Sequence, residues 1–325
     1  MKKHLRLDVT DASLYPGVVE LLRHLPSSVL FHRKYSFRHP AAIYLLSLRQ
    51  LAYDFTRVLD GYSALRSGAV PFNKLDEQMS QSQRILIYSL REHLDDCQMI
   101  LMCFVDPDSI PYQGRSPDEM LKSAGFKERK IFWDGVHNYS NSYLMPLVNA
   151  LKHSQGRLRT FVFENSPSDI RPGFYLEEMD ENEVAQPSAQ LHQSDSAFSY
   201  ARDIRNNLAL VFRAAESLKD AISTAMKRLS VATTSTTDGP GVQPSLWTDV
   251  CKRVASLDDG VFPQETKDSF IRFSQTAEGT LQIRELDRDF KLSFPSTAKC
   301  HAMTLGDGMT KSFRMPYLGK KSIRK

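Results

Sequence analysis

The sequence lacks the cysteine patterns that mark metal-binding, redox and disulfide-stapled proteins. Its cysteines, Cys97, Cys103, Cys251 and Cys300, include no C-x-x-C spacing, which argues against a zinc site or a thioredoxin-like motif. A chain of 325 residues can bury a large core without disulfides. We therefore expect reduced thiols, no metal and no cofactor, in a cytoplasmic protein.

Long apolar runs are also missing. The most apolar run, residues 99–105, is far shorter than the roughly 20 residues that a membrane-spanning helix needs. The first ten residues, MKKHLRLDVT, contain no apolar stretch, so we expect neither a signal peptide nor a membrane partner. Glycine-rich phosphate-binding signatures and nucleophile-elbow patterns are absent as well.

The net charge of +4 is too small to indicate a nucleic-acid-binding protein, but the charge is unevenly distributed. Residues 31–39, FHRKYSFRH, interleave basic and aromatic side chains, and residues 299–325 form a basic tail. Cationic side chains contact phosphates and aromatic rings stack on bases, so both segments are candidates for contact with RNA. The alternative is a solvated basic loop whose aromatic rings pack on the protein.

Apolar residues recur at helical spacing in four long stretches, which predicts four long helices. These stretches are residues 41–66, 74–105, 127–159 and 197–229, and a shorter helix is expected from Pro117 to Gly125. Residues 158–164, 173–178 and about 184–192 read as strands. The predicted fold class is α+β and predominantly α: an up-and-down bundle of long helices with a small inserted antiparallel sheet.

Residues 230–244 are rich in Ser, Thr, Gly and Pro and have no apolar period, so they are predicted to be a linker. We expect the bundle to occupy residues 1–229, with the inserted sheet at about 158–192. Residues 245–325 are expected to form a small β-rich domain, or a cap on the bundle, with a basic tail.

The helix predicted for residues 127–159 has an unusual polar side. One side collects mainly amide and hydroxyl residues, namely Asp134, Asn138, Asn141, Ser142, Met145, Asn149, Lys152 and His153. Asparagine is a poor helix former, so an amide-rich face suggests a function beyond solubility. Pro146 should kink this helix or divide it in two.

At the end of this helix, Asn149, Lys152 and His153 form the most plausible chemical group in the sequence. Asn149 and His153 are four residues apart and share a helix face. Histidine can act as an acid or base near neutral pH, and Arg157 and Arg159 add positive charge nearby. The alternative is that Lys152 and His153 only complement the dipole at the helix C-terminus.

A bundle of long helices that carries Asn-x-x-Lys-His near a helix end resembles the HEPN-type helical proteins of bacterial conflict and phage-defence systems. The resemblance covers about residues 40–228. It implies a protein that binds or cleaves RNA or a nucleotide-containing ligand. If the chain is an enzyme, the resemblance implies a metal-independent ribonuclease, with His153 as the acid or base.

The sequence departs from that family at one motif position. Ribonucleases of the family carry an Arg, four to six residues and then a His, whereas Pro146, Leu147 and Val148 occupy those positions before His153. The spacing occurs elsewhere at Arg33 and His39, which we therefore include as candidate substrate-binding residues with Arg157 and Arg159. Asn149 and Lys152 would position the phosphate.

The alternative function is a non-catalytic interaction or scaffold protein. The amide-rich face would then bind a protein partner or form a homodimer. A further set, His93, Asp96 and Cys97, has helical spacing that could ligate metal. No fourth ligand is evident there, and Cys97 is better explained as a core residue.

Overall fold

The structure, a computed structural model, describes most of the chain. The described residues are 5–11, 13–68, 72–111, 116–153, 156–166, 169–179, 185–192, 197–233, 245–262, 265, 270–286 and 299–302. Most of the linker expected at residues 230–244 and most of the basic tail lie outside these ranges. In the described residues, no helix is long and apolar enough to cross a membrane.

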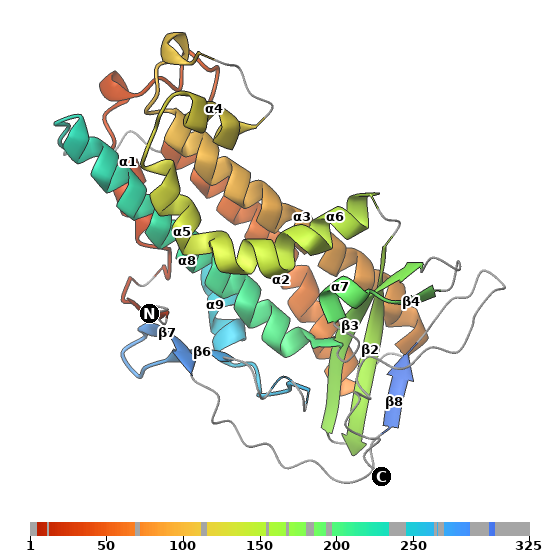
Figure 1. Cartoon of the computed structure of the whole chain (residues 1–325). Helices are drawn as coiled ribbons and strands as arrows, with labels where there is room; N and C mark the ends of the chain where they lie inside the picture. Colours follow the sequence, from red (N-terminus) through yellow and green to blue (C-terminus); the bar gives the residue numbers. More distant parts are fainter. Residues whose placement is uncertain are drawn as a thin grey trace.

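Long helices form the main layer, as the apolar periodicity predicted (Figure 1). The helices are α1 Val18–Arg23, α2 Pro40–Ser67, α3 Phe72–Met102, α4 Pro117–Ser123, α5 Arg129–Tyr139, α6 Met145–His153, α7 Ala189–His192, α8 Tyr200–Arg228 and α9 Ser245–Ala255. Local signals fix several starts: Pro40 is the first residue of α2, and the hydroxyls of Ser116 and Ser199 accept N-terminal amides of α4 and α8. The predicted class, predominantly α with β additions, is confirmed.

The predicted helix at residues 127–159 is interrupted just before Pro146. Between α5 and α6, residues Ser140–Leu144 form a π-helical turn, and the chain changes direction there (Figure 1). Proline has no amide hydrogen to donate and its ring crowds the preceding turn. A wider π turn accommodates that ring and bends the helix without ending it.

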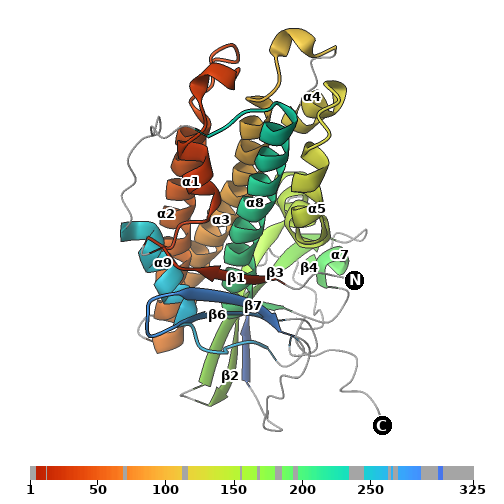
Figure 2. The same cartoon turned by 90° about the vertical axis from the view of Figure 1, so that its left-hand side faces the viewer.

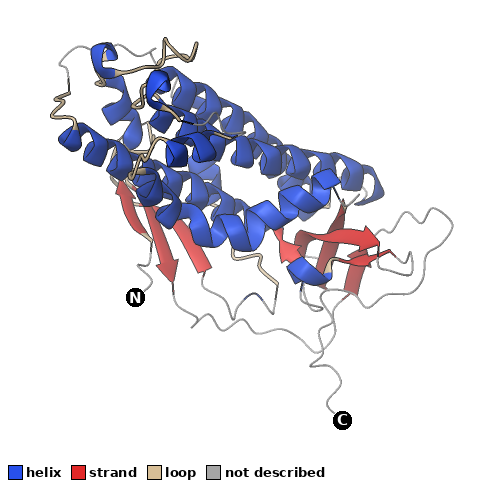
Figure 3. Cartoon of the chain, turned by 45° about the horizontal axis from the view of Figure 1, so that its top comes forward, coloured by secondary structure: helices blue, strands red, loops and turns tan. Residues whose placement is uncertain are grey.

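Two antiparallel sheets lie on the same side of the helical layer, as separate groups (Figure 3). The strands are β1 Arg6–Val9, β2 Arg157–Ser166, β3 Asp169–Met179, β4 Ala185–Pro187, β5 Phe198–Ser199, β6 Phe270–Gln275, β7 Leu281–Leu286 and β8 Lys299–Ala302. One sheet has the order β1-β7-β6 and the other β4-β3-β2-β8, with β5 also paired to β3. Each sheet therefore joins segments from distant parts of the sequence.

The inserted sheet differs from the prediction at its third strand. A single strand was expected for residues 184–192. In the structure, the strand β4 covers only Ala185–Pro187, and Ala189–His192 form the short helix α7. The Leu176 amide donates to Nε2 of the buried His192, at 2.9 Å, and the Ser188 amide donates to the Leu176 carbonyl. The helical turn brings His192 back over β3, where its ring replaces a strand partner.

The C-terminal segments pack against the helical bundle. The indole of Trp247 in α9 is buried and donates to the Leu14 carbonyl at 2.9 Å, and β1 pairs with β7 from Arg6↔Arg284 to Val9↔Leu281. Apolar residues of α9, β6 and β7 belong to the same core cluster as those of the bundle. In the described residues, this part is built as a cap on the helices.

Helices α5 and α8 approach each other closely at Gly135. A Cβ atom at this position would lie 1.7 Å from Oγ and 2.8 Å from Cβ of Ser217. Both distances are below any normal contact, so the absence of a side chain at Gly135 sets the spacing of the two helices.

We predict that Gly135→Ala lowers the free energy of unfolding by about 1–3 kcal/mol, because α5 must move away from α8. Urea unfolding measures the loss. Gly17→Ala is the matched control: its Cβ would meet only flexible side-chain ends at 3.4 Å or more. A change within about 0.5 kcal/mol is expected there. Equal stability of Gly135→Ala and the control would contradict this close approach.

Candidate functional site

A cleft of about 940 Å³ lies beside α8. One wall is α5 with the π turn, the floor is α8, and the opposite side is formed by residues Leu5–Leu7, Ile271 and Glu285. Figure 2 shows the sheet of β1, β7 and β6 beside the lower part of α8. The cleft is within the volume range of small-molecule sites.

Two helical stripes face each other across the cleft. The wall contributes Asp134, Gly135, Asn138, Tyr139, Ser142 and Tyr143, and α8 contributes Arg202, Asp203, Asn206, Ala209, Leu210, Arg213, Glu216, Ser217 and Asp220. Steps of three or four residues keep each set on one helix face. From Arg202 to Asp220, α8 extends for about 27 Å, so the cleft is elongated.

The deep end of the cleft is built around the carboxylate of Asp203, which is only 4% exposed. Its Oδ1 accepts the Tyr143 hydroxyl, and its Oδ2 accepts the side-chain amides of Gln83 and Asn207. Tyr139 donates in turn to Oδ1 of Asn207 at 2.8 Å. This network ties α3, α5, the π turn and α8 together.

Burial raises the pKa of Asp203 to about 6, although hydrogen bonds from Tyr143 and Gln83 act in the opposite direction. The nearby Glu265 also raises this pKa, and Arg202 lowers it. Burial likewise holds the pKa of Tyr139 and Tyr143 well above the ordinary tyrosine value. A buried carboxyl group that can exchange a proton near neutral pH is a common feature of functional sites.

Acidic groups outnumber basic groups in the lining of the cleft. The carboxylates are Asp134, Asp203, Glu216, Asp220, Glu265 and Glu285, and the guanidinium groups are Arg6, Arg202 and Arg213. Arg213 pairs with Glu285 at 2.7 Å, and Arg202 lies 3.6 Å from Glu265. Much of the positive charge is thus already compensated, which is unfavourable for a strand with many phosphates.

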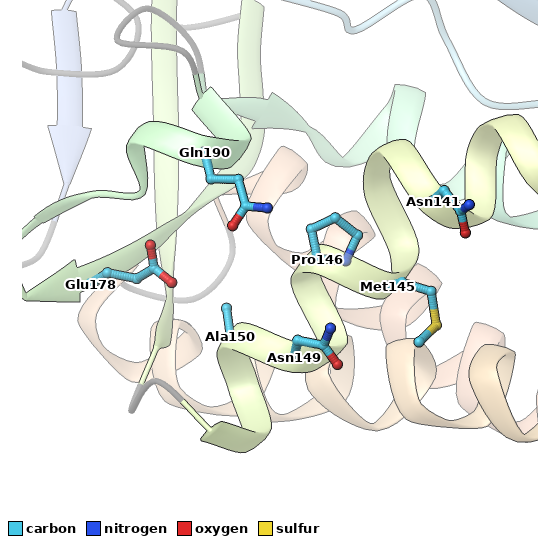
Figure 4. A pocket seen from close by; sticks show the side chains of 7 residues that line it. All are labelled: Asn141, Met145, Pro146, Asn149, Ala150, Glu178 and Gln190. Carbon is cyan, nitrogen blue, oxygen red and sulfur yellow. The ribbon is translucent and has the colours of Figure 1, made fainter.

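Asn149 lies in a different place, a smaller pocket of about 250 Å³ on the other side of the π turn. This small pocket is lined by Asn141, Met145, Pro146, Asn149, Ala150, Glu178 and Gln190 (Figure 4). The π turn therefore divides the amide-rich face. Asp134, Asn138 and Ser142 line the cleft, while Asn141, Met145 and Asn149 line the small pocket.

Lys152, His153 and Arg157 are exposed at the junction of α6 and β2, and none of them lines the cleft or the small pocket. The Lys152 ammonium lies 5.7 Å from the centre of the Tyr88 ring, a cation–π contact with α3. The structure thus brings these three residues to one surface region.

Arg159 lies inside the protein, with 6% of its surface exposed. Its Nε and one terminal nitrogen donate to Oε1 of Glu177 at 3.0 and 2.8 Å. Glu177 is buried too, so the pair links β2 and β3, and the Arg159 guanidinium faces the sheet partner.

Arg33 and His39 lie at another end of the bundle. The Phe31 amide donates to the Cys103 carbonyl, just beyond the end of α3, and His39 caps α2 through its Nδ1. Lys152 contacts Tyr88 of α3, whereas residues 31–39 lie near Met102 at the end of the same helix. About 21 Å of helix separates Tyr88 from Met102. The structure therefore does not bring Arg33 or His39 together with His153.

The aromatic side chains of residues 31–39 pack onto the protein. Tyr35 and Phe37 stack at 5.2 Å and are partly buried against the core. Lys34 forms ion pairs with Asp106 and Asp108, each at 2.7 Å. Packing thus covers part of the aromatic faces that stacking on RNA would need, while Arg33 and Arg38 stay exposed.

In the described part of the chain, no group of three or more His, Cys, Asp or Glu residues could hold a metal ion. His93 is buried, its Nδ1 lies 2.9 Å from Ser47 Oγ, and burial lowers its pKa to about 4. Cys97 is buried beside it, as expected of a core residue.

Asp203, Asn207 and Gln83 were not predicted from the sequence as site residues. Asp203 and Asn207 are four residues apart within the apolar pattern of α8, and Tyr139 and Tyr143 have the same spacing on the facing helix. Two such polar pairs on apolar helix faces were the available signal, because buried polar groups need hydrogen-bonding partners.

No family model, curated protein or solved structure matches the chain. Any function must therefore be inferred from the chain's own residues. The cleft and its buried network are the features with the most definite chemistry.

The raised pKa of Asp203 gives a prediction for stability. The pKa of Asp203 is about 6 in the folded protein, above the ordinary value of 3.8. The protonated carboxyl group therefore stabilises the folded state below about pH 4, and this stabilisation is lost as the pH rises through about 6. Asp203→Asn does not titrate. The stability advantage of the wild type over this variant should therefore shrink between pH 4 and 7, by on the order of 3 kcal/mol.

Urea unfolding of both proteins across this pH range measures the difference. Asp134→Asn, which changes an exposed carboxylate of the same cleft, is the control and should follow the wild-type profile. Parallel profiles for wild type and Asp203→Asn would show that Asp203 does not titrate in this range.

Proposed function

We propose that the protein binds a small nucleotide-type ligand, a ribonucleoside or its monophosphate, in the cleft beside α8. The observation that carries this proposal is the cleft itself, whose volume of about 940 Å³ accommodates such a molecule. The proposal follows the resemblance to HEPN-type proteins in its ligand class, but assigns binding to α5 and α8.

The cleft offers the groups that a nucleoside needs. Rings of Tyr139, Tyr143 and Phe198 lie at its deep end, and Asn138, Ser142 and Asn206 add hydrogen-bonding groups along it. Aromatic rings stack on bases, while amides and hydroxyls can bond to a base edge or a ribose. Arg6, which is exposed in the lining of the cleft, supplies a cation for one phosphate group.

Binding is favoured over cleavage at this cleft. The excess of carboxylates opposes entry of an RNA strand, whose many phosphates would meet like charge. A small ligand with few charges avoids this cost. We place the protein in the cytoplasm, where such ligands occur.

We predict that ribonucleosides or their monophosphates raise the melting temperature, because a ligand that binds only the folded state stabilises it by mass action. At a free concentration of 100 times Kd the gain is about 2.7 kcal/mol. Asn138→Trp should abolish the shift by filling the cleft from an exposed position on its wall.

His137→Trp is the matched control, since His137 is the neighbouring exposed residue and does not line the cleft. It should retain the full shift. A flat melting temperature with every nucleoside and monophosphate would overturn the proposed function.

A second candidate function is RNA cleavage at the junction of α6 and β2. It rests on the exposure of Lys152, His153 and Arg157 in one surface region. His153 would act as the acid or base, with Lys152 and Arg157 on the phosphate. Asn149 lies one helical turn before His153 and lines the small pocket.

The expected result is RNA cleavage that persists with a chelator and is lost in His153→Ala, by at least about 100-fold. His137→Ala, another exposed histidine of the same bent helix, should leave the rate unchanged. The measurement is the cleavage rate of a labelled RNA. Equal rates for wild type and His153→Ala, or none in either, would exclude catalysis by His153.

The interaction alternative, a homodimer or a complex with a protein partner, also stays a prediction. Exposed apolar side chains that such a contact could use include Tyr53 on α2 and Met179 at the end of β3, which are 48% and 55% exposed. Single exposed apolar residues are common on monomers, so we favour the cleft as the functional feature.

A further inference from the structure

Asp203 presents an unused hydrogen-bond acceptor at the deep end of the cleft. Among the described residues, its Oδ2 accepts two amides, from Gln83 and Asn207, whereas its Oδ1 accepts one donor, the Tyr143 hydroxyl. A carboxylate has about four acceptor positions on its two oxygens. One position on Oδ1 is therefore available, on a side chain that lines the cleft.

Three aromatic rings line the cleft together with Asp203. The ring of Tyr143 lies 5.2 Å from that of Phe198 in an edge-to-face arrangement and 5.2 Å from that of Tyr139. Aromatic walls beside a buried polar atom favour a planar ligand whose edge carries the complementary polar group.

The complementary group must be a donor. The cation nearest to Asp203 in sequence, Arg202, lies 3.6 Å from Glu265. Glu265 also accepts the backbone amides of Ser199 and Phe262, at 2.9 and 2.8 Å. A ligand carbonyl placed against Oδ1 would set two acceptors against each other, whereas an amino group would bond to it.

We propose that Asp203 selects the ligand, by accepting a hydrogen bond from an amino group on the edge of a planar base that lies against Tyr143 and Phe198. This inference rests on the proposed function and narrows it to amino-bearing bases. Cytosine and adenine carry such an exocyclic amino group. Uracil and hypoxanthine carry a carbonyl at the corresponding position, so their edge offers Oδ1 only a ring N–H as a donor.

Two matched pairs of nucleosides test the selection: cytidine against uridine, and adenosine against inosine. Each pair exchanges an amino group for a carbonyl and leaves the ring size unchanged. Titration calorimetry of the full chain should show about tenfold or greater preference for the amino member of at least one pair. Asp203→Asn places an amide at the same position, so the preference should fall to near unity or reverse.

Tyr143→Phe is a second test variant for the case that Asp203→Asn does not fold. It keeps the Asp203 carboxylate and removes one of its hydrogen-bond donors. The amino preference should persist in this variant, because Oδ1 remains an acceptor. Equal affinity for both members of each pair would overturn the role of Asp203 and leave the proposed function standing. Absence of binding by every ribonucleoside and monophosphate, these four included, would overturn both. A preference that is unchanged in Asp203→Asn would also overturn the role of Asp203.

Discussion

The arrangement of the helices depends on the dehydrated carboxylate of Asp203. Burying an ionisable group is costly unless hydrogen bonds compensate for the lost water. Here the compensation comes from three parts of the fold at once: Gln83 on α3, Tyr143 in the π turn, and Asn207 on α8 itself. Each donor must stay within bonding distance, so the network restricts how α3, α8 and the bent helix can move relative to one another. Apolar packing alone would permit more alternative arrangements, because it has no directional requirement.

The π turn is the local feature that makes this network possible. It precedes Pro146, whose missing amide hydrogen would weaken a regular helix at this point. Tyr139 and Tyr143 lie on either side of its start, and their hydroxyls reach Asn207 and Asp203, which are four residues apart on α8. Two hydrogen bonds, Tyr139 to Asn207 and Tyr143 to Asp203, thus connect the bent helix to α8 at successive turns. The bend has a second consequence: the polar face of the helix divides between the cleft and the small pocket, so that Asn138 and Asn149 belong to different surfaces.

The long helices could be predicted from the sequence because periodicity, N-terminal caps and proline positions are local signals. The pairing of the strands could not be predicted, because a strand pattern does not specify its partner. β1 pairs with β7, near the other end of the chain, and β2 pairs with β8. The same limit affected the site. Arg159 was predicted to bind substrate beside His153, yet the pairing of β2 and β3 brings it to Glu177 inside the protein. Asn149 lines a pocket, whereas Asp203 could not be identified from the sequence because two of its donors, Gln83 and Tyr143, come from distant segments of the chain.

At the deep end of the cleft, the residue proposed to bind the ligand also stabilises the fold, whereas along the rest of the cleft the exposed lining residues contribute little to stability. Asp203 is both a wall of the cleft and the centre of the network that fixes α3, α8 and the π turn, so a change in its charge affects the fold as well as any ligand. Asn138 and Ser142 are exposed on the wall and can change with little effect on packing. Gly135 sets the distance between α5 and α8 through its close approach to Ser217. In the proposed function, a ligand would meet a rigid acceptor at Asp203 and exposed side chains along the wall formed by α5, where substitutions have little effect on packing.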